Sequence, residues 1–162
     1  MASRPSRQSK PALRQAYRIA DRRHKIFEGE GAALLGGRWN SPGRRVIYAA
    51  ETYAGAMLEL LASANIGRMP KHHVWIEILI GEDVSVDEVD AGALRRWDAP
   101  DQRTSRMFGD TWYAEKRSTV LIVPSAVVRM ERNVVINQEH PGFRKLRASA
   151  PKPVVWDQRL FR

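Results

Sequence analysis

The sequence predicts a single α+β domain in which strands outnumber helices. Its 162 residues are 43% apolar and include five tryptophans, so the chain can bury one sizeable core but is too short for two ordinary domains. Apolar runs of strand length recur along the chain, whereas one segment has a clear helical pattern. No internal repeat is found, which favours one compact unit.

The net charge of +9 is concentrated at the N-terminus. Residues 1–25 contain eight Lys or Arg and one Asp, and the remaining residues have a balance of only +2. We expect residues 1–15, rich in Ser, Pro, Gln and Arg, to form a basic flexible tail ahead of a domain over residues 16–162. A solvated tail accounts for this charge at least as well as a nucleic-acid-binding arm.

The first expected strand is Ala16–Ala20, in which alternation puts Tyr17 and Ile19 on a buried face and Arg18 on the opposite face. The segment from Gly29 to Gly43 is rich in glycine and contains Pro42, which indicates a long, tightly folded connection.

A second strand, Val46–Ala50, leads into the expected helix. Thr52 is a suitable N-cap, and the helix should run to about Ala64. We expect its core stripe to consist of Ala54, Met57, Leu58 and Leu61. Glu59 lies three or four positions from small residues, namely Gly55, Ala56, Ala62 and Ser63. A bulky ligand could therefore approach its carboxylate.

Four further strands are expected after this helix. The first, Val74–Ile80, ends at Gly81 before a mostly acidic segment that continues to Asp90. The others are Thr119–Val123, stopped by Pro124, then Asn133–Asn137, and a last strand at Val154–Trp156.

Several common functional classes lack their sequence signals. There is no cysteine, and the four histidines lack metal-ligand spacing, so we expect no metal site and a reducing, cytoplasmic compartment. Neither a serine-hydrolase elbow, a P-loop nor a dinucleotide Gly-x-Gly-x-x-Gly motif is present. No apolar run reaches membrane-spanning length and the N-terminus does not resemble a signal peptide, so we expect no membrane association.

One spaced set of motifs resembles the RES domain, a family named for Arg, Glu and Ser. The set begins with Gly36-Gly37-Arg38-Trp39-Asn40 and continues with Tyr48 in an Ile-Tyr-Ala strand and Glu59 in the next helix. Later matches are the Val-Pro-Ser-Ala segment containing Ser125, the segment 133–137, His140-Pro141 and the closing Asp157–Leu160. The resemblance extends from about Tyr17 to the C-terminus. It departs at Gln138, where the family commonly has proline.

This resemblance implies a toxin of a bacterial type II toxin–antitoxin pair. It also implies a fold similar to diphtheria-type ADP-ribosyltransferases, with a mixed, mainly antiparallel β core and flanking helices. The implied substrate is NAD, and the implied partner is a helix-turn-helix (Xre-type) antitoxin that blocks the site. ADP-ribose would pass to water, to phosphate or to a target protein, and the sequence leaves the acceptor and the oligomeric state open.

The resemblance also assigns roles to five residues. Glu59 would hydrogen-bond the ribose hydroxyls and stabilise the oxocarbenium-like state. Arg18 and Arg38 would hold phosphate or ribose oxygens, and Tyr48 would stack on nicotinamide. Ser125 would offer a hydroxyl to the nucleotide. We count Glu59, Arg18 and Tyr48 as catalytic, and Arg18, Arg38, Tyr48 and Ser125 as NAD-binding.

Structural alternatives exist for each of these residues. Glu59 could be a solvated helix residue, Arg38 could stack on Trp39, Tyr48 could be a half-buried strand aromatic, and Ser125 could cap the turn after Pro124. Trp39 is expected in the core. For the whole chain, the competing function is a basic nucleic-acid-binding or ribonuclease-type toxin, motivated by the charged tail. An inert structural partner is a third possibility.

Overall fold

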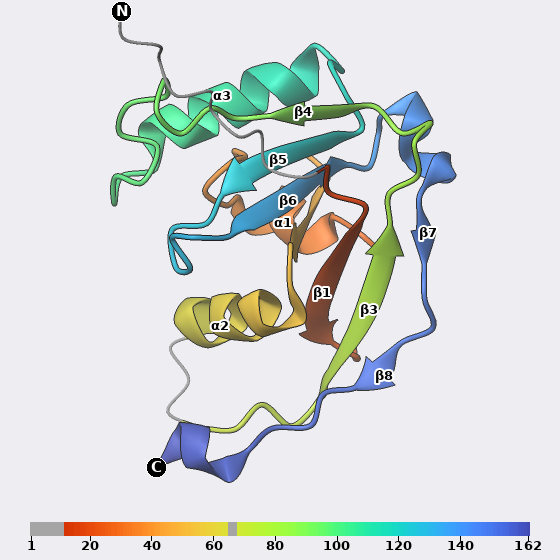
Figure 1. Ribbon diagram of the computed structural model, residues 1–162, viewed down its shortest axis with the longest axis vertical. Helices are drawn as coiled ribbons and strands as arrows, with labels where there is room; N and C mark the ends of the chain where they lie inside the picture. Colours follow the sequence, from red (N-terminus) through yellow and green to blue (C-terminus); the bar gives the residue numbers. More distant parts are fainter. Residues whose placement is uncertain (1–11, 65–67) are drawn as a thin grey trace, which may run out of the picture.

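The computed structural model describes residues 12–64 and 68–162, and in this part of the chain one sheet of eight strands organises the fold (Figure 1). The strands are β1 (Gln15–Asp21), β2 (Val46–Ala50), β3 (His73–Leu79), β4 (Val86–Glu88), β5 (Val120–Pro124), β6 (Arg132–Asn137), β7 (Arg147–Ala148) and β8 (Lys152–Pro153). The helices are α1 (Glu30–Leu35), α2 (Tyr53–Ala64) and α3 (Arg103–Ala114), with short 3-10 helices η1 (Pro141–Lys145) and η2 (Gln158–Phe161).

The sheet has the order β4-β5-β6-β2-β1-β3-β7, and β8 also pairs with β3. The pair β4–β5 is parallel, and the other paired strands are antiparallel. The predicted α+β fold with a mixed, mainly antiparallel sheet is therefore confirmed.

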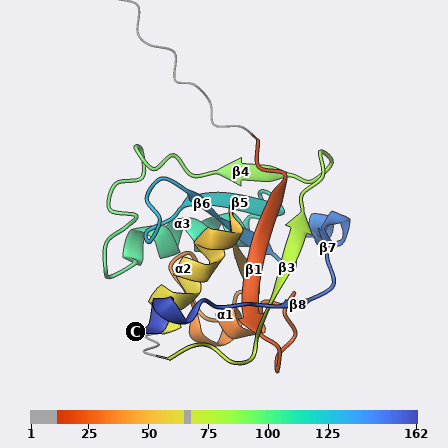
Figure 2. The same cartoon turned by 60° about the horizontal axis from the view of Figure 1, so that its bottom comes forward.

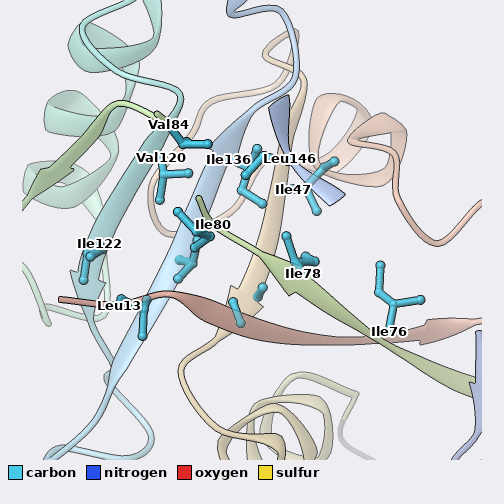
Figure 3. Close-up of a cluster of buried hydrophobic side chains, with 13 residues drawn as sticks. Leu13, Ile47, Ile76, Ile78, Ile80, Val84, Val120, Ile122, Ile136 and Leu146 are labelled. Atoms are coloured by element: carbon cyan, nitrogen blue, oxygen red, sulfur yellow. The ribbon is translucent and has the colours of Figure 1, made fainter. Parts of the chain in front are cut away.

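The sheet curls around one apolar cluster (Figure 3). Ile76 and Ile78 of β3 share this cluster with Val120 and Ile122 of β5, although three strands separate β3 from β5 in the sheet. Leu13, which precedes β1, joins the same cluster. Such contacts across the width of the sheet require strong curvature.

The helices lie on the outer face of this sheet, as Figure 1 and Figure 2 show. Alternate residues of β5 and β6 point to this face, where Leu121, Val123 and Val135 pack with the fully buried Trp112 of α3. Helix α2 covers β1 and β2. Burial on both faces matches the continuous apolar runs of these strands, Val120–Val123 in β5 and Val134–Ile136 in the centre of β6.

Five of the predicted strands are confirmed to within a residue or two: β1, β2, β3, β5 and β6. The prediction of a last strand at Val154–Trp156 is wrong. Pairing with β3 ends at Pro153, and the chain then leaves the sheet, with Val155 85% exposed. Trp156 turns inward instead, where its ring meets that of Phe161 at a centroid distance of 5.8 Å.

The predicted buried face of β1 is also wrong, although the alternation is confirmed. Ala16 is fully buried in the core cluster, and Arg18 lies on that same face. Tyr17 points the other way, where its ring packs edge-on against Tyr53 of α2 at 6.2 Å.

Helix α2 begins after Thr52, whose hydroxyl accepts a hydrogen bond from the Gly55 amide at 2.9 Å, so the predicted N-cap is confirmed. The predicted core stripe is wrong: Leu58 is 46% exposed and Ala54 is exposed, whereas Gly55 and Ala56 are buried. The helix lies so close to the loop before β6 that a Cβ on Gly55 would stand 2.7 Å from the Glu131 carboxylate.

Several elements were not expected from the sequence, namely α1, β4, α3, β7 and the two 3-10 helices. The glycine-rich connection contains α1, and the acidic segment contains β4, which extends the sheet beside β5. Helix α3 is largely polar, and its buried residues are Ser105, Gly109 and Trp112. Its packing face therefore consists of two small residues and one tryptophan, which gives no stripe of large apolar side chains.

The expected basic tail, residues 1–15, lies mostly outside the described residues. Of the part that is described, Leu13 packs in the core and Gln15 begins β1. Among the described helices, none has the length and apolar character needed to cross a membrane.

The contact between α3 and the connection from α1 to β2 generates a stability prediction. A Cβ on Gly109 would overlap the carbonyl oxygen of Trp39, so we expect Gly109→Ala to destabilise the protein by about 3 kcal/mol or more. Gly31→Ala is the matched control, because a Cβ on this α1 glycine meets nothing within 4 Å. Thermal unfolding should show a large decrease in Tm for Gly109→Ala alone, and equal Tm values would contradict this packing.

Candidate active site

The candidate site lies where β1 and β2 separate. These strands share one backbone pair, Tyr17 with Ala50. Beyond it the Arg18 guanidinium bridges the gap, with Nη1 donating to the Tyr48 carbonyl at 2.8 Å and Nε donating to the Ile26 carbonyl at 2.6 Å. Burial lowers the pKa of Arg18 to about 10, which leaves it protonated at neutral pH. Arg18 therefore keeps a positive charge inside the opening.

A cavity of about 780 Å³ occupies this opening, a size typical of small-molecule sites. Its walls come from β1, β2, α1, α2, α3, the glycine-rich loop and the start of β6. Among the residues that line it, Arg18, Arg38 and Arg106 are basic and Glu59 is the one acidic side chain. The cavity therefore favours an anionic ligand.

Glu59 is fixed through one of its two carboxylate oxygens. Oε1 accepts hydrogen bonds from the Ser125 hydroxyl at 2.7 Å and from the Asn133 side-chain amide at 2.6 Å. Oε2 has no hydrogen-bond partner among the described residues. Because Glu59 lines the cavity, this arrangement leaves one carboxylate oxygen available to a ligand in a fixed orientation.

Ser125 lies behind Glu59. Its side chain is 1% exposed, and its hydroxyl also accepts a hydrogen bond from the Val128 amide at 2.8 Å. Ser125 thus caps the turn after Pro124 and at the same time donates a hydrogen bond to Glu59. In this state the hydroxyl proton is directed to Glu59 and not to the cavity.

The Tyr48 ring lines the cavity while its hydroxyl is held at the far end. The hydroxyl donates to Asn40 Oδ1 at 2.6 Å and accepts from the Trp39 amide at 3.1 Å. Burial raises the pKa of this hydroxyl well above its ordinary value, so it remains protonated. A Cβ on Gly37 would stand 2.7 Å from it, which explains the glycine at this position of the Gly-Gly-Arg-Trp-Asn segment.

That segment is anchored on both sides. Asn40 is fully buried, and its side-chain amide donates to the Ala32 carbonyl of α1 at 2.9 Å. Asp110 of α3 accepts from the Ser41 amide at 2.8 Å and pairs with Arg44 at 2.9 Å. Trp39, 2% exposed, belongs to the second core cluster, as expected.

Arg38 and Arg106 line the cavity beside this segment. Arg38 Nη1 donates to the carbonyls of Trp97 and Ala99 at 3.2 and 3.1 Å. Arg106 Nε donates to the Gly37 carbonyl at 3.3 Å, and its Nη2 donates to Gln102 Oε1 at 3.1 Å. All four acceptors are neutral, and in the described part of the chain neither guanidinium forms an ion pair with a carboxylate, although, besides the hydrogen bond from Arg129, the charge of Arg38 contributes to lowering the pKa of Asp98.

The structure brings the five sequence-predicted residues to one place, four of them on the cavity wall and Ser125 directly behind it. Sequence reasoning missed Asn133, Asn40 and Arg106. Asn133 begins the strand expected at 133–137. Because side chains alternate along a strand, Asn133 lies on the face opposite to that of the buried Val134, and this alternation could have identified it. Arg106 carries no motif signal, because α3 itself was not expected.

In the described ranges, no group of three or more Asp, Glu or His side chains could hold a metal ion. His140 caps η1, with its Nδ1 accepting from the Gly142 amide at 2.9 Å.

Removal of the Tyr48 hydroxyl should destabilise the fold measurably. Tyr48→Phe leaves the Trp39 amide and the Asn40 oxygen without their partner, which we expect to cost about 2 kcal/mol. Tyr53→Phe is the matched control, because the Tyr53 hydroxyl makes no hydrogen bond to the described residues. Thermal unfolding should show a Tm lower by about 4–8 °C for Tyr48→Phe only. An unchanged Tm would contradict this anchoring role.

Comparison with known proteins supports the motif assignment. The model of the RES domain matches residues 15–157. The chain is 36% identical over 140 residues to a protein named "Prs ADP-ribosylating toxin" from Sphingobium sp. (strain YBL2), covering 84% of this chain and 87% of that protein. It is 33% identical over 133 residues to "Toxin Res" of Photorhabdus laumondii, covering 80% and 85%.

A solved structure shows the same fold. The toxin–antitoxin complex MbcT–MbcA of M. tuberculosis contains a chain that matches with a TM-score of 0.72 at 20% identity, covering 91% of this chain and 86% of that chain. The family model spans nearly all of the described residues, including the Arg, Glu and Ser positions that surround the cavity. The chain belongs to the RES domain family.

Proposed function

We propose that this chain is the toxin of a bacterial toxin–antitoxin pair and that it cleaves the nicotinamide–ribose bond of NAD. The observation that carries the proposal is the carboxylate of Glu59, fixed through Oε1 by Ser125 and Asn133 with Oε2 left for a ligand. It stands in a cavity whose other charged lining residues are arginines, which suits a ligand with two phosphates and a ribose. The relatives named ADP-ribosylating toxin and Toxin Res support the same reaction class.

The reaction breaks the bond between C1′ of the ribose and the nicotinamide nitrogen. The bonding electron pair leaves with nicotinamide, and positive charge develops on C1′ and the ring oxygen. Oε2 of Glu59 would accept a hydrogen bond from a ribose hydroxyl and stabilise that charge. The acceptor oxygen, from water, phosphate or a protein side chain, then forms the new bond to C1′ and releases its proton.

The other residues bind and orient the substrate in this proposal. The Tyr48 ring would stack on nicotinamide, and Arg18 and Arg38 would hold phosphate or ribose oxygens. Ser125 is assigned a positioning role, because its proton is directed to Glu59 and its side chain is buried. This sharpens the sequence interpretation, in which its hydroxyl was offered to the nucleotide.

The partner proposed for this toxin is an antitoxin of the helix-turn-helix, Xre type that covers the cavity. This proposal rests on family membership and on the relatives named as toxins. A target protein for ADP-ribosylation is a further possible acceptor, in line with the Sphingobium relative's name.

The decisive experiment incubates the purified chain with NAD and follows nicotinamide release. We expect release by the wild type and a decrease of about 10²- to 10³-fold in kcat for Glu59→Gln, which keeps the shape and removes the charge. Glu82→Gln is the control, because that carboxylate is 89% exposed and, among the described residues, pairs with Arg14. Wild-type protein that releases no nicotinamide would refute the proposal, and unchanged turnover in Glu59→Gln would refute the mechanism.

The same incubation can identify the acceptor. Free ADP-ribose indicates water, and ADP-ribose 1-phosphate, formed only when phosphate is added, indicates phosphorolysis. Labelled protein in a cell lysate supplied with labelled NAD indicates a protein acceptor.

Asn133→Ala should lower kcat by about tenfold, because a charge-assisted hydrogen bond to Glu59 is lost. If Asn133 acts through Glu59, the same change should have little further effect in a Glu59→Gln background. A thermal melt of each variant controls for folding. Additive losses of activity in the double variant would show that Asn133 acts independently of Glu59.

A further inference from the structure

Arg106 of α3 lies outside the sequence motifs discussed above but lines the same cavity as Glu59. We infer that Arg106, together with Arg38, binds the diphosphate of the dinucleotide and makes the site select a nucleoside diphosphate group. This inference rests on the proposed function and deepens it, because it assigns binding residues to the diphosphate, which belongs to the part of NAD that does not react.

The hydrogen bonding of both side chains leaves donors for a ligand. A guanidinium has five N–H donors, and Arg106 directs two of them to the Gly37 carbonyl and Gln102 Oε1. Arg38 likewise directs two to the carbonyls of Trp97 and Ala99. Each therefore retains three N–H donors without a partner among the described residues. These existing bonds hold the guanidinium groups in place before a ligand arrives.

Arg106 and Arg38 are linked through the backbone of Gly37. Arg106 is bonded directly to Gly37, the residue before Arg38, and Gly37 has no space for a side chain because of the Tyr48 hydroxyl. Burial raises the pKa of that hydroxyl; the positive charges of Arg106 and Arg38 oppose the rise, and the negative charge of Asp110 adds to it. Both positive charges therefore act near the Tyr48 hydroxyl, at the α3 side of the cavity.

The charges of the cavity match those of a diphosphate. Three arginines and Glu59 give the lining residues a balance of +2, and the diphosphate of a dinucleotide carries about −2. Arg18 is already bonded to two carbonyls in the gap between β1 and β2. Arg18 is buried in that gap, which leaves Arg38 and Arg106 for the diphosphate, and Glu59, on a different helix, for the ribose that reacts.

The test compares Arg106→Gln with Arg103→Gln in the full chain. Arg103 begins the same helix, is exposed and does not line the cavity, so its replacement removes the same charge elsewhere. The ligand is ADP, which has the diphosphate but no nicotinamide, and binding is measured by calorimetry. We expect Arg106→Gln to raise the Kd for ADP and the KM for NAD by about 10- to 100-fold, with kcat within about threefold of wild type. Arg103→Gln should change neither.

Arg106→Lys keeps the charge and removes the planar fork, so its affinity for ADP should lie between those of wild type and Arg106→Gln. If Arg106→Gln does not fold, the inference is tested with Arg106→Lys instead. An Arg106→Lys affinity for ADP equal to that of the wild type then overturns the inference. An Arg106→Gln Kd within twofold of wild type, or equal weakening by Arg103→Gln, also overturns it. ADP binding that depends on Arg106 in a protein that releases no nicotinamide would instead refute the proposed function and leave the diphosphate site intact.

Discussion

Beyond the pair formed by Tyr17 and Ala50, β1 and β2 separate, and the guanidinium of Arg18 takes the place of the missing backbone ladder. Placing a cation there is unfavourable unless its donors are satisfied, and the carbonyls of Tyr48 and Ile26 satisfy two of them. This bridge keeps the sheet continuous while it leaves a lined opening. The cavity, its positive charge and the position of the Tyr48 ring all depend on that separation.

Two helices bring the polar groups to this opening by packing through small residues. Gly55 and Ala56 allow α2 to lie close to the sheet, and Glu59, one turn later on that side, reaches the cavity wall. Gly109 allows α3 to touch the backbone of Trp39. The same close packing therefore fixes the loop that carries Arg38 and brings Arg106 of α3 to the cavity.

The strands could be predicted because alternation and continuous apolar runs are local signals, and β5 and β6, buried on both faces, are the clearest examples. The buried faces of the helices were harder to predict, because the usual rule expects large apolar residues to be buried. In α2 that rule selected Leu58, which is exposed, over Gly55. In α3 the same rule found no apolar stripe, so the helix was not predicted and Arg106 could not be assigned to the site. The roles of Glu59 and Ser125 came from family motifs, whereas their hydrogen bond joins residues 66 positions apart and needed the fold.

The most direct test of this account is a crystal structure of the Glu59→Gln variant with NAD, in which slow turnover preserves the substrate. The account predicts the nicotinamide ribose beside residue 59, the nicotinamide against the Tyr48 ring, and the diphosphate between Arg38 and Arg106. A dinucleotide bound outside the opening between β1 and β2, or bound there with its diphosphate beside residue 59, would contradict it.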